Sequence, residues 1–159
     1  MNNTAVFRSA YVASDIRRLI WPGLGAGMAF LGFEIVVGAF TGSPWSFPQS
    51  IPQVIGASAP TPAFEPLSTA LGVAIHLMFS IGLGVLFAAL AGRLRIRGKR
   101  LIAAAVLFMW AESAISIWAV LHTFFPDTLP ILFSAVPFWA SFVGRTGFGL
   151  VLAALHTDR

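Results

Sequence analysis

Residues 67–92 read LSTALGVAIHLMFSIGLGVLFAALAG, and this stretch decides the fold. Within it, small residues recur at every fourth position around a single histidine: Gly72, His76, Ser80, Gly84, Ala88 and Gly92. Residues four apart lie on one face of a helix. Small side chains let a second helix approach closely inside a membrane. We therefore expect a membrane-spanning helix whose small-residue face is a helix-packing seam.

The composition is typical of a membrane protein. Of the 159 residues, 57% are hydrophobic and only 10% are charged, and the mean hydropathy is +0.84. Soluble domains carry about 25% charged residues, so we expect a single membrane domain and a lipid bilayer as its surroundings. The net charge is +4, but aromatic and basic residues are not interleaved, so we expect no nucleic acid partner. The chain has no Cys, which leaves it without a disulfide or a thiolate-held cluster.

Four apolar stretches predict an all-α bundle of four transmembrane helices, at residues 19–42, 67–92, 101–122 and 130–155. The first is about 36 Å long at helical rise, enough to cross a bilayer core with some tilt. We interpret it as a retained helix rather than a signal peptide, because it contains Glu34 and no small-x-small cleavage site follows it. Residues 1–16 are expected to be a short tail or an interfacial helix. Pro137 is expected to kink the last helix.

The segment 43–66 is a Pro-rich connecting loop. It contains six of the ten prolines and neither Lys nor Arg. Residues 48–55 are apolar enough to predict one short helix, ending at Gly56, that lies in the membrane interface. We interpret this helix as a lipid-facing connector; the alternative is a folded lid over the bundle.

The distribution of basic residues predicts the orientation. None lies between Arg18 and Arg93, and none lies between Arg100 and Arg145. The positive-inside rule then places both termini and the turn 93–100 in the cytoplasm. The turn has five basic residues that would contact lipid headgroups: Arg93, Arg95, Arg97, Lys99 and Arg100. Either they only set the topology or they form an anionic-lipid site.

Each predicted helix contains one ionisable residue away from its ends: Glu34, His76, Glu112 and Arg145 in turn. Counting from the cytoplasmic ends places Glu34 and His76 at about 22 and 24 Å, and Glu112 and Arg145 at about 16 and 14 Å. Ionisable groups in hydrocarbon face the interior of the bundle and find partners. We therefore predict two pairs across helices, Glu34 with His76 and Glu112 with Arg145.

The two pairs differ in chemistry. Arg145 remains charged and can hold a carboxylate, so its pair with Glu112 should be permanent. His76 can change its charge near neutral pH, so its pair with Glu34 should be titratable. The alternative is that all four residues only fix helix register. The last helix repeats the four-residue spacing, and Ser141 and Gly149 extend the packing seam on that helix.

Catalytic and cofactor chemistry is not expected. Ser80, Ser113, Ser116 and Ser141 lack a neighbouring base, so we expect no enzyme activity. The Glu-x-x-His pairs of bundle di-iron sites are absent from the sequence, and we expect no metal. His122 and His156 do not match the expected depth of His76, so a bis-His haem is not expected and we assign no cofactor.

The run Gly72-Val-Ala-Ile-His76-Leu-Met-Phe79-Ser80 resembles the Gly-x-x-x-His-x-x-Phe-Ser run of the YagU-like group of small bacterial inner-membrane proteins. The Pro-rich connection before it and the helix order are also similar. The resemblance implies a bacterial inner-membrane protein with a loose association with acid resistance. It implies no role for Glu34, Glu112 or Arg145.

Two functions of different classes are consistent with these observations. The first hypothesis is a non-catalytic accessory subunit or self-associating scaffold, present as a homo-oligomer or in a larger membrane complex. The alternative is a proton- or ion-linked small carrier or channel that uses Glu34 and His76. A cofactor-binding membrane subunit is a third and weaker hypothesis.

Overall fold

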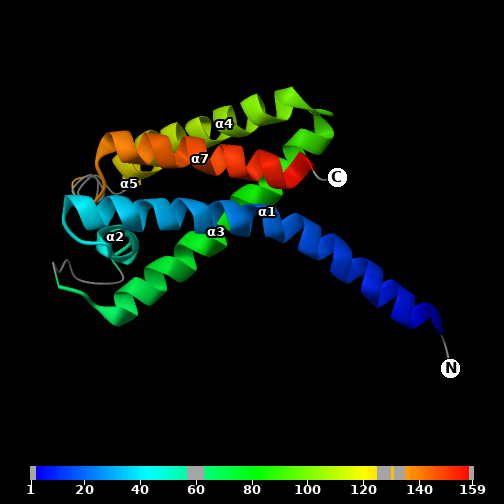
Figure 1. Cartoon of the computed structure of the whole chain (residues 1–159), viewed down its shortest axis with the longest axis horizontal. Coiled ribbons are helices and arrows are strands. Elements are labelled where there is room, and N and C mark those ends of the chain that lie inside the picture. The colour runs from blue at the N-terminus through cyan, green and yellow to red at the C-terminus, as the bar shows by residue number, and fades with distance from the viewer. Residues whose placement is uncertain (1–2, 57–62, 125–129, 131–134, 158–159) are drawn as a thin grey trace.

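The computed structural model describes residues 3–56, 63–124, 130 and 135–157, without the side chains of residues 3–16, 119–121 and 157. The described part is built from helices, which follow one another along the chain: α1 (Asn3–Thr41), α2 (Ser46–Val54), α3 (Pro66–Arg93), α4 (Lys99–Ala114), the π-helix η1 (Ile115–Leu121), α5 (His122–Phe124) and α7 (Phe138–Thr157). The predicted all-α fold is confirmed (Figure 1).

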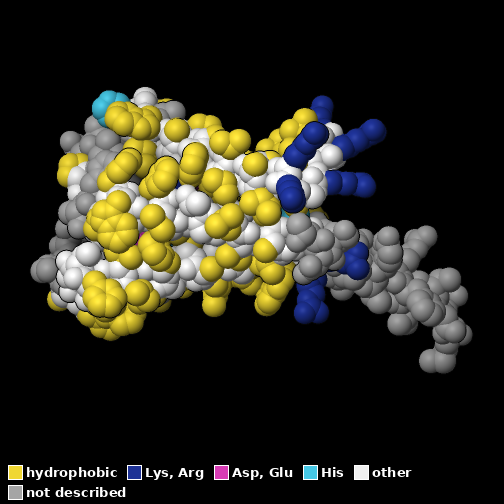
Figure 2. Space-filling view, turned by 45° about the horizontal axis from the view of Figure 1, so that its top comes forward, with side chains coloured by type: hydrophobic (Ala, Val, Ile, Leu, Met, Phe, Trp, Pro, Cys, Tyr) yellow, Lys and Arg dark blue, Asp and Glu magenta, His cyan; other side chains and the backbone are white. Residues whose placement is uncertain are grey.

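Among the described residues, four helical segments are long and apolar enough to cross a membrane: Arg17–Thr41, Pro66–Arg93, Lys99–Phe124 and Phe138–His156. The chain is therefore a multi-pass membrane protein with a four-helix bundle. Figure 2 shows hydrophobic side chains over the flank of this bundle, while Lys and Arg gather at one end. We call that end the basic end and the opposite one, where α2 lies, the α2 end.

The four long helices do not pack equally around the bundle. Helix α1 packs against α3 on one side and against α7 on the other, and α7 packs in turn against α4. Helices α3 and α4 follow one another in the sequence but contact each other little. Figure 1 shows α4 and α7 running side by side, whereas α3 crosses α1 obliquely. The packing order α3, α1, α7, α4 leaves space between α3 and α4.

Glycine allows the closest approach between α1 and α3. A Cβ atom on Gly23 would lie 2.5 Å from the carbonyl oxygen of Ser80, and one on Gly84 would lie 2.5 Å from the Cα of Gly23. Ser80 and Gly84, from the expected seam, thus lie against α1. A Cβ on Gly149 would lie 2.9 Å from the Cα of Val106, so α7 approaches α4 in the same way.

The seam does not continue along the whole of α3. Gly72 faces α2, because a Cβ there would lie 1.8 Å from the carbonyl oxygen of Pro48. At the other end, Ala88 and Gly92 line a cavity, and a Cβ on Gly92 would meet nothing within 4 Å. The expectation of one continuous seam is wrong because α3 crosses α1 at an angle, so its small-residue face leaves α1 after a few turns.

Helix α2 packs on the bundle and does not simply join two spans. Pro48, Ser50 and Pro52 are almost fully buried, and the Gln49 side-chain amide donates to the Ala63 carbonyl oxygen at 3.0 Å. The helix ends before Gly56, whose φ is +72°. Helix α2 is therefore packed on α3, while Trp45 and Ile55 at its ends are exposed; a role as a lid stays a prediction. The packing depends on Gly72, whose missing side chain admits the backbone of α2.

The ends of the spans differ from the predicted ones in two places. Helix α1 already begins at Asn3, so the expected tail is continuous with the first span and extends beyond the other helices (Figure 1). Helix α7 begins at Phe138, directly after Pro137, whose carbonyl oxygen accepts from the backbone N–H of Ala140. Pro137 thus precedes this helix instead of kinking it, while residues 131–134 of the predicted span lie outside the described residues.

Candidate intramembrane site

A cavity of about 290 Å³ lies between α3 and α4. Phe30 of α1 and Phe148 of α7 contribute to its wall, and Phe47 and Ile51 of α2 line it from the α2 end. Most of the lining is apolar. The polar lining consists of five side chains: His76 and Ser80 from α3, Glu112 from α4, Ser116 from η1 and Arg145 from α7. Three of the four ionisable residues singled out in the sequence therefore share one cavity.

The predicted contact between Glu112 and Arg145 is present. Arg145 Nη1 donates to Glu112 Oε2 at 2.7 Å, and the two side chains are 18% and 10% exposed for Arg145 and Glu112 respectively. The hydroxyl of Ser116 donates to the other carboxylate oxygen, Oε1, at 2.6 Å. Both oxygens of Glu112 are thus satisfied. A carboxylate held in this way keeps the neighbouring guanidinium in a fixed position.

Arg145 itself retains unused hydrogen-bonding capacity. Its Nε donates to Ser141 Oγ over a long 3.4 Å, and only Nη1 contacts Glu112. Nη2 has no hydrogen-bond partner among the described side chains. The pair is therefore not the bidentate arrangement that a guanidinium can form, and donors of Arg145 remain available at the cavity.

The local backbone of α4 helps to place the carboxylate. Glu112 is followed by the π-helix Ile115–Leu121, and Ser116 lies within it. π-helical turns are rare and are frequent at functional sites. Sequence analysis considered Ser116 only as a possible nucleophile and missed its hydrogen bond to Glu112. The spacing of four residues between the two was the available signal.

His76 is held by the backbone of α1 and by two aromatic rings. Its Nε2 lies 3.1 Å from the carbonyl oxygen of Gly27, and since a carbonyl only accepts, Nε2–H is the donor. The imidazole stacks on Phe30 with ring centroids 5.4 Å apart, and Phe47 contacts it edge-on at 5.5 Å. This leaves Nδ1 without a hydrogen-bond partner in the described ranges. The neutral ring can accept a proton there.

The predicted pair of Glu34 and His76 is absent. Glu34 is only 1% exposed, and neither of its carboxylate oxygens has a hydrogen-bond partner in the part of the chain that the structure describes. Its Oε1 lies next to α7, 3.0 Å from where a Cβ on Gly144 would be. On α1, Gly27 and not Glu34 is level with His76. These two α1 residues are seven apart, or about 10 Å along the helix.

The five basic residues of the turn 93–100 lie together at the basic end (Figure 2). They do not share one environment. All five are exposed, but among them Arg95 and Arg97 line a second cavity there, whereas Arg93, Lys99 and Arg100 do not. The second cavity also lies between α3 and α4, and the rings of Phe87 and Phe108, 5.5 Å apart, make contact across these two helices.

Comparison with protein-family models, with curated proteins and with solved structures finds no match for this chain. The functional proposal is therefore based on the chemistry of the site. Within the described residues, no three His, Asp or Glu side chains come close enough to hold a metal ion. What the cavity offers is an imidazole with one free nitrogen, a fixed guanidinium with unused donors, and hydroxyl groups inside an apolar wall. Such a site can accept and release a proton or hold a small anion.

Proposed function

We propose that this chain is a small carrier or channel of the inner membrane of a bacterium, in which protons or small ions pass through the cavity between α3 and α4. One observation carries the proposal. Three helices each contribute one ionisable side chain to the same cavity, and two of these, His76 and Arg145, keep hydrogen-bonding capacity that nothing in the described residues uses. In this proposal the protein moves a solute and leaves it chemically unchanged.

Residues that only fix helix register have no need of a cavity. Polar side chains that act in this way satisfy one another directly between packed helices. Here an open volume of about 290 Å³ separates His76 on α3 from the Glu112–Arg145 pair on α4 and α7. Ionisable groups that line a space inside a membrane protein are characteristic of ion and proton pathways. This supports the carrier over a scaffold.

Each polar group has a distinct role in the proposal. His76 accepts and releases the proton at Nδ1, because Nε2–H is held by Gly27. Arg145 provides a fixed positive charge that attracts an anion, and Glu112 positions it. Glu34 lies one helical turn from Phe30, whose ring stacks on His76, and provides a second buried carboxyl group.

Proton flux into proteoliposomes tests the proposal. The purified protein is reconstituted with a pH-sensitive dye inside the vesicles, and a potassium gradient with valinomycin drives proton entry between about pH 5 and pH 8. His76→Phe keeps a ring of similar size against Phe30 and removes the titratable nitrogens. The matched control is His122→Phe, since His122 is exposed and lies outside the cavity.

We expect flux from the wild type and from His122→Phe, and flux at the protein-free level from His76→Phe. Wild-type vesicles that are no leakier than protein-free vesicles over this range would rule out a proton pathway. Equal flux through both variants would show that protons do not use His76.

Accessory subunit or self-associating scaffold is the second candidate function. The observation that favours it is the first part of α1, which extends beyond the helices of its own chain (Figure 1). Purification in a gentle detergent, followed by mass measurement of the intact complex, tests this function. Companion chains or an oligomer would support it, and a monomer alone would remove it.

The orientation belongs to the proposal as well. Lys and Arg gather at one end of the bundle, and this favours a cytoplasmic location for the basic end and for both termini. The resemblance to the YagU-like group supports the bacterial inner membrane. Attachment of an impermeant label to either terminus in sealed cells tests the orientation, because labelling from outside would contradict it.

A further inference from the structure

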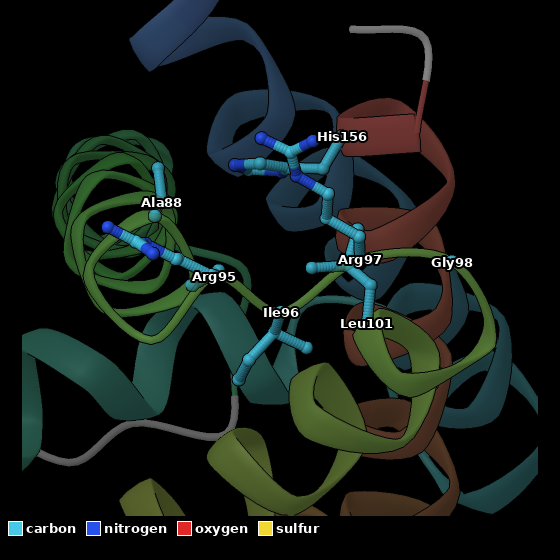
Figure 3. Close-up of a pocket in the computed structure, with 9 residues that line it drawn as sticks. Ala88, Arg95, Ile96, Arg97, Gly98, Leu101 and His156 are labelled. Atoms are coloured by element: carbon cyan, nitrogen blue, oxygen red, sulfur yellow. The ribbon is translucent and has the colours of Figure 1, made fainter.

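A second cavity, with a volume of about 570 Å³, lies at the basic end, outside the intramembrane site. The last turns of α3, the connection to α4, the first turn of α4 and His156 of α7 line it. Figure 3 shows Arg97 on the side of His156 and Arg95 beside α3, with Ile96 between them. No acidic side chain is among its lining residues in the described part of the chain. The cavity is thus positively charged.

The backbone places Arg95 where glycine is the usual residue. Helix α3 ends in a Schellman motif, in which Ile96 N–H donates to the Ala91 carbonyl oxygen at 3.0 Å and Arg95 N–H donates to the Gly92 carbonyl oxygen at 3.2 Å. The residue in this motif that takes the left-handed conformation is Arg95, with φ of +53°. A side chain there is strained, and such strain is concentrated at functional sites. The hydrogen bonds of this motif involve backbone atoms only, so the motif does not explain why the residue here carries a guanidinium group.

Arg95 and Arg97 leave the connection on either side of Ile96, with Arg95 extending over the end of α3 and Arg97 toward His156 (Figure 3). Ile96 packs against the hydrophobic core and anchors the loop, so Arg95 and Arg97 project from either side of a fixed residue. Ala88, Ala91 and Gly92 of α3 have little or no side chain, which leaves the cavity open. Helix α4 begins beside it at Lys99 without a side-chain cap, and helix N-termini favour negative charge.

We propose that this cavity binds the phosphate group of an anionic membrane lipid through Arg95 and Arg97. Arg93 is the last residue of one membrane-length segment, Lys99 is the first of the next, and His156 is the last of another, so the cavity lies at the level where lipid phosphates meet the hydrocarbon. A single guanidinium can donate two parallel hydrogen bonds to a phosphate group, and two arginines line this cavity. Anionic headgroups gather in such basic sites between transmembrane helices.

Native mass spectrometry of the whole chain in detergent tests the proposal, with dioleoylphosphatidylglycerol as the probe. A second arm uses dioleoylphosphatidylcholine, and a third adds inorganic phosphate as a competitor. The test variant is Arg95→Gly with Arg97→Gln. Glycine at position 95 relieves the left-handed conformation, so the fold is retained. The control variant is Arg93→Gln with Arg100→Gln, which removes the same charge from the same segment but not from the lining of the cavity.

We expect saturable binding of one phosphatidylglycerol, weakened about tenfold or more in the test variant and changed less than about twofold in the control, since charged hydrogen bonds contribute most of such contacts. Equal weakening in both variants would overturn the proposal, because it would show only diffuse attraction to charge. Displacement of the lipid by millimolar inorganic phosphate, or equal binding of phosphatidylcholine, would overturn the assignment to an anionic lipid.

Discussion

Substitution of Gly72 by Ala tests the contact that brings α2 onto the bundle. A Cβ atom at position 72 would lie 1.8 Å from the carbonyl oxygen of Pro48 and 2.7 Å from its carbonyl carbon. Both are backbone atoms of a helix, so no side-chain rotation can relieve the overlap. An ordinary contact begins at 3.4 Å, and α2 would have to move by about 1.6 Å to reach it.

The matched control is Gly82→Ala on the same helix, because a Cβ there would meet nothing within 4 Å. Both changes gain about 1 kcal/mol of helix propensity, since each replaces Gly in a helix interior. At position 72 alone, overpacking opposes this gain with a cost of about 1–3 kcal/mol. The difference in melting temperature between the variants should therefore be about 2–12 °C, with Gly72→Ala the lower.

Thermal unfolding in detergent, followed by circular dichroism or by a dye that reports exposed surface, measures this difference. The wild type should fall below Gly82→Ala. Equal melting temperatures for Gly72→Ala and Gly82→Ala would show that α2 does not pack on α3. They would also contradict the position of Phe47 and Ile51 in the wall of the cavity.

Three further changes bear on the charged groups. Arg145→Met should destabilise the protein by about 3 kcal/mol, because it leaves the carboxylate of Glu112 without its cation, and adding Glu112→Met should recover most of the loss in thermal unfolding; additive losses would show that the pair is uncoupled. Glu34→Met should raise the free energy of unfolding by about 1–3 kcal/mol, since neither oxygen of Glu34 is hydrogen-bonded to a described residue, and should lower proton flux; a less stable variant would reveal a partner for Glu34. Arg95→Gly should stabilise the protein by about 1 kcal/mol through relief of the positive φ, whereas Arg97→Gly should not; equal effects would contradict the strain.

The four spans could be predicted from the sequence because their signal is local. Length, hydropathy and the clusters of Lys and Arg do not depend on how the helices pack. The contact between Glu112 and Arg145 was also predictable. Helices α4 and α7 pack against each other with Gly149 at their contact, so a count of residues along each helix gives the correct level.

The pair of Glu34 and His76 could not be predicted in this way. The same count assumes upright helices, and α3 crosses α1 obliquely, which brings His76 to Gly27. Glycine patterns have a similar limit. Gly72 indicates that another helix approaches α3 closely. The residues around Gly72 do not indicate that Pro48 is the contact.

The cavity itself was beyond sequence analysis. A connection of only a few residues between α3 and α4 favours helices that pack side by side. In the structure α3 packs mainly against α1 and α4 mainly against α7, so α3 and α4 contact each other little and face each other across a cavity. The space that results is set by the order of packing and not by any single residue.

Reaction of single cysteines tests most directly whether this cavity is an aqueous polar site within the membrane. The chain has no Cys, so Ser116→Cys and Ile115→Cys each introduce a single thiol, at equal depth in η1. Ser116 lines the cavity, whereas Ile115 is 59% exposed on the outer surface. A charged, water-soluble thiol reagent reacts with thiolates, which form only where water reaches. In proteoliposomes, we expect Ser116→Cys to be labelled and Ile115→Cys to stay unlabelled, while labelling of neither or of both at equal rates would contradict an aqueous site between α3 and α4.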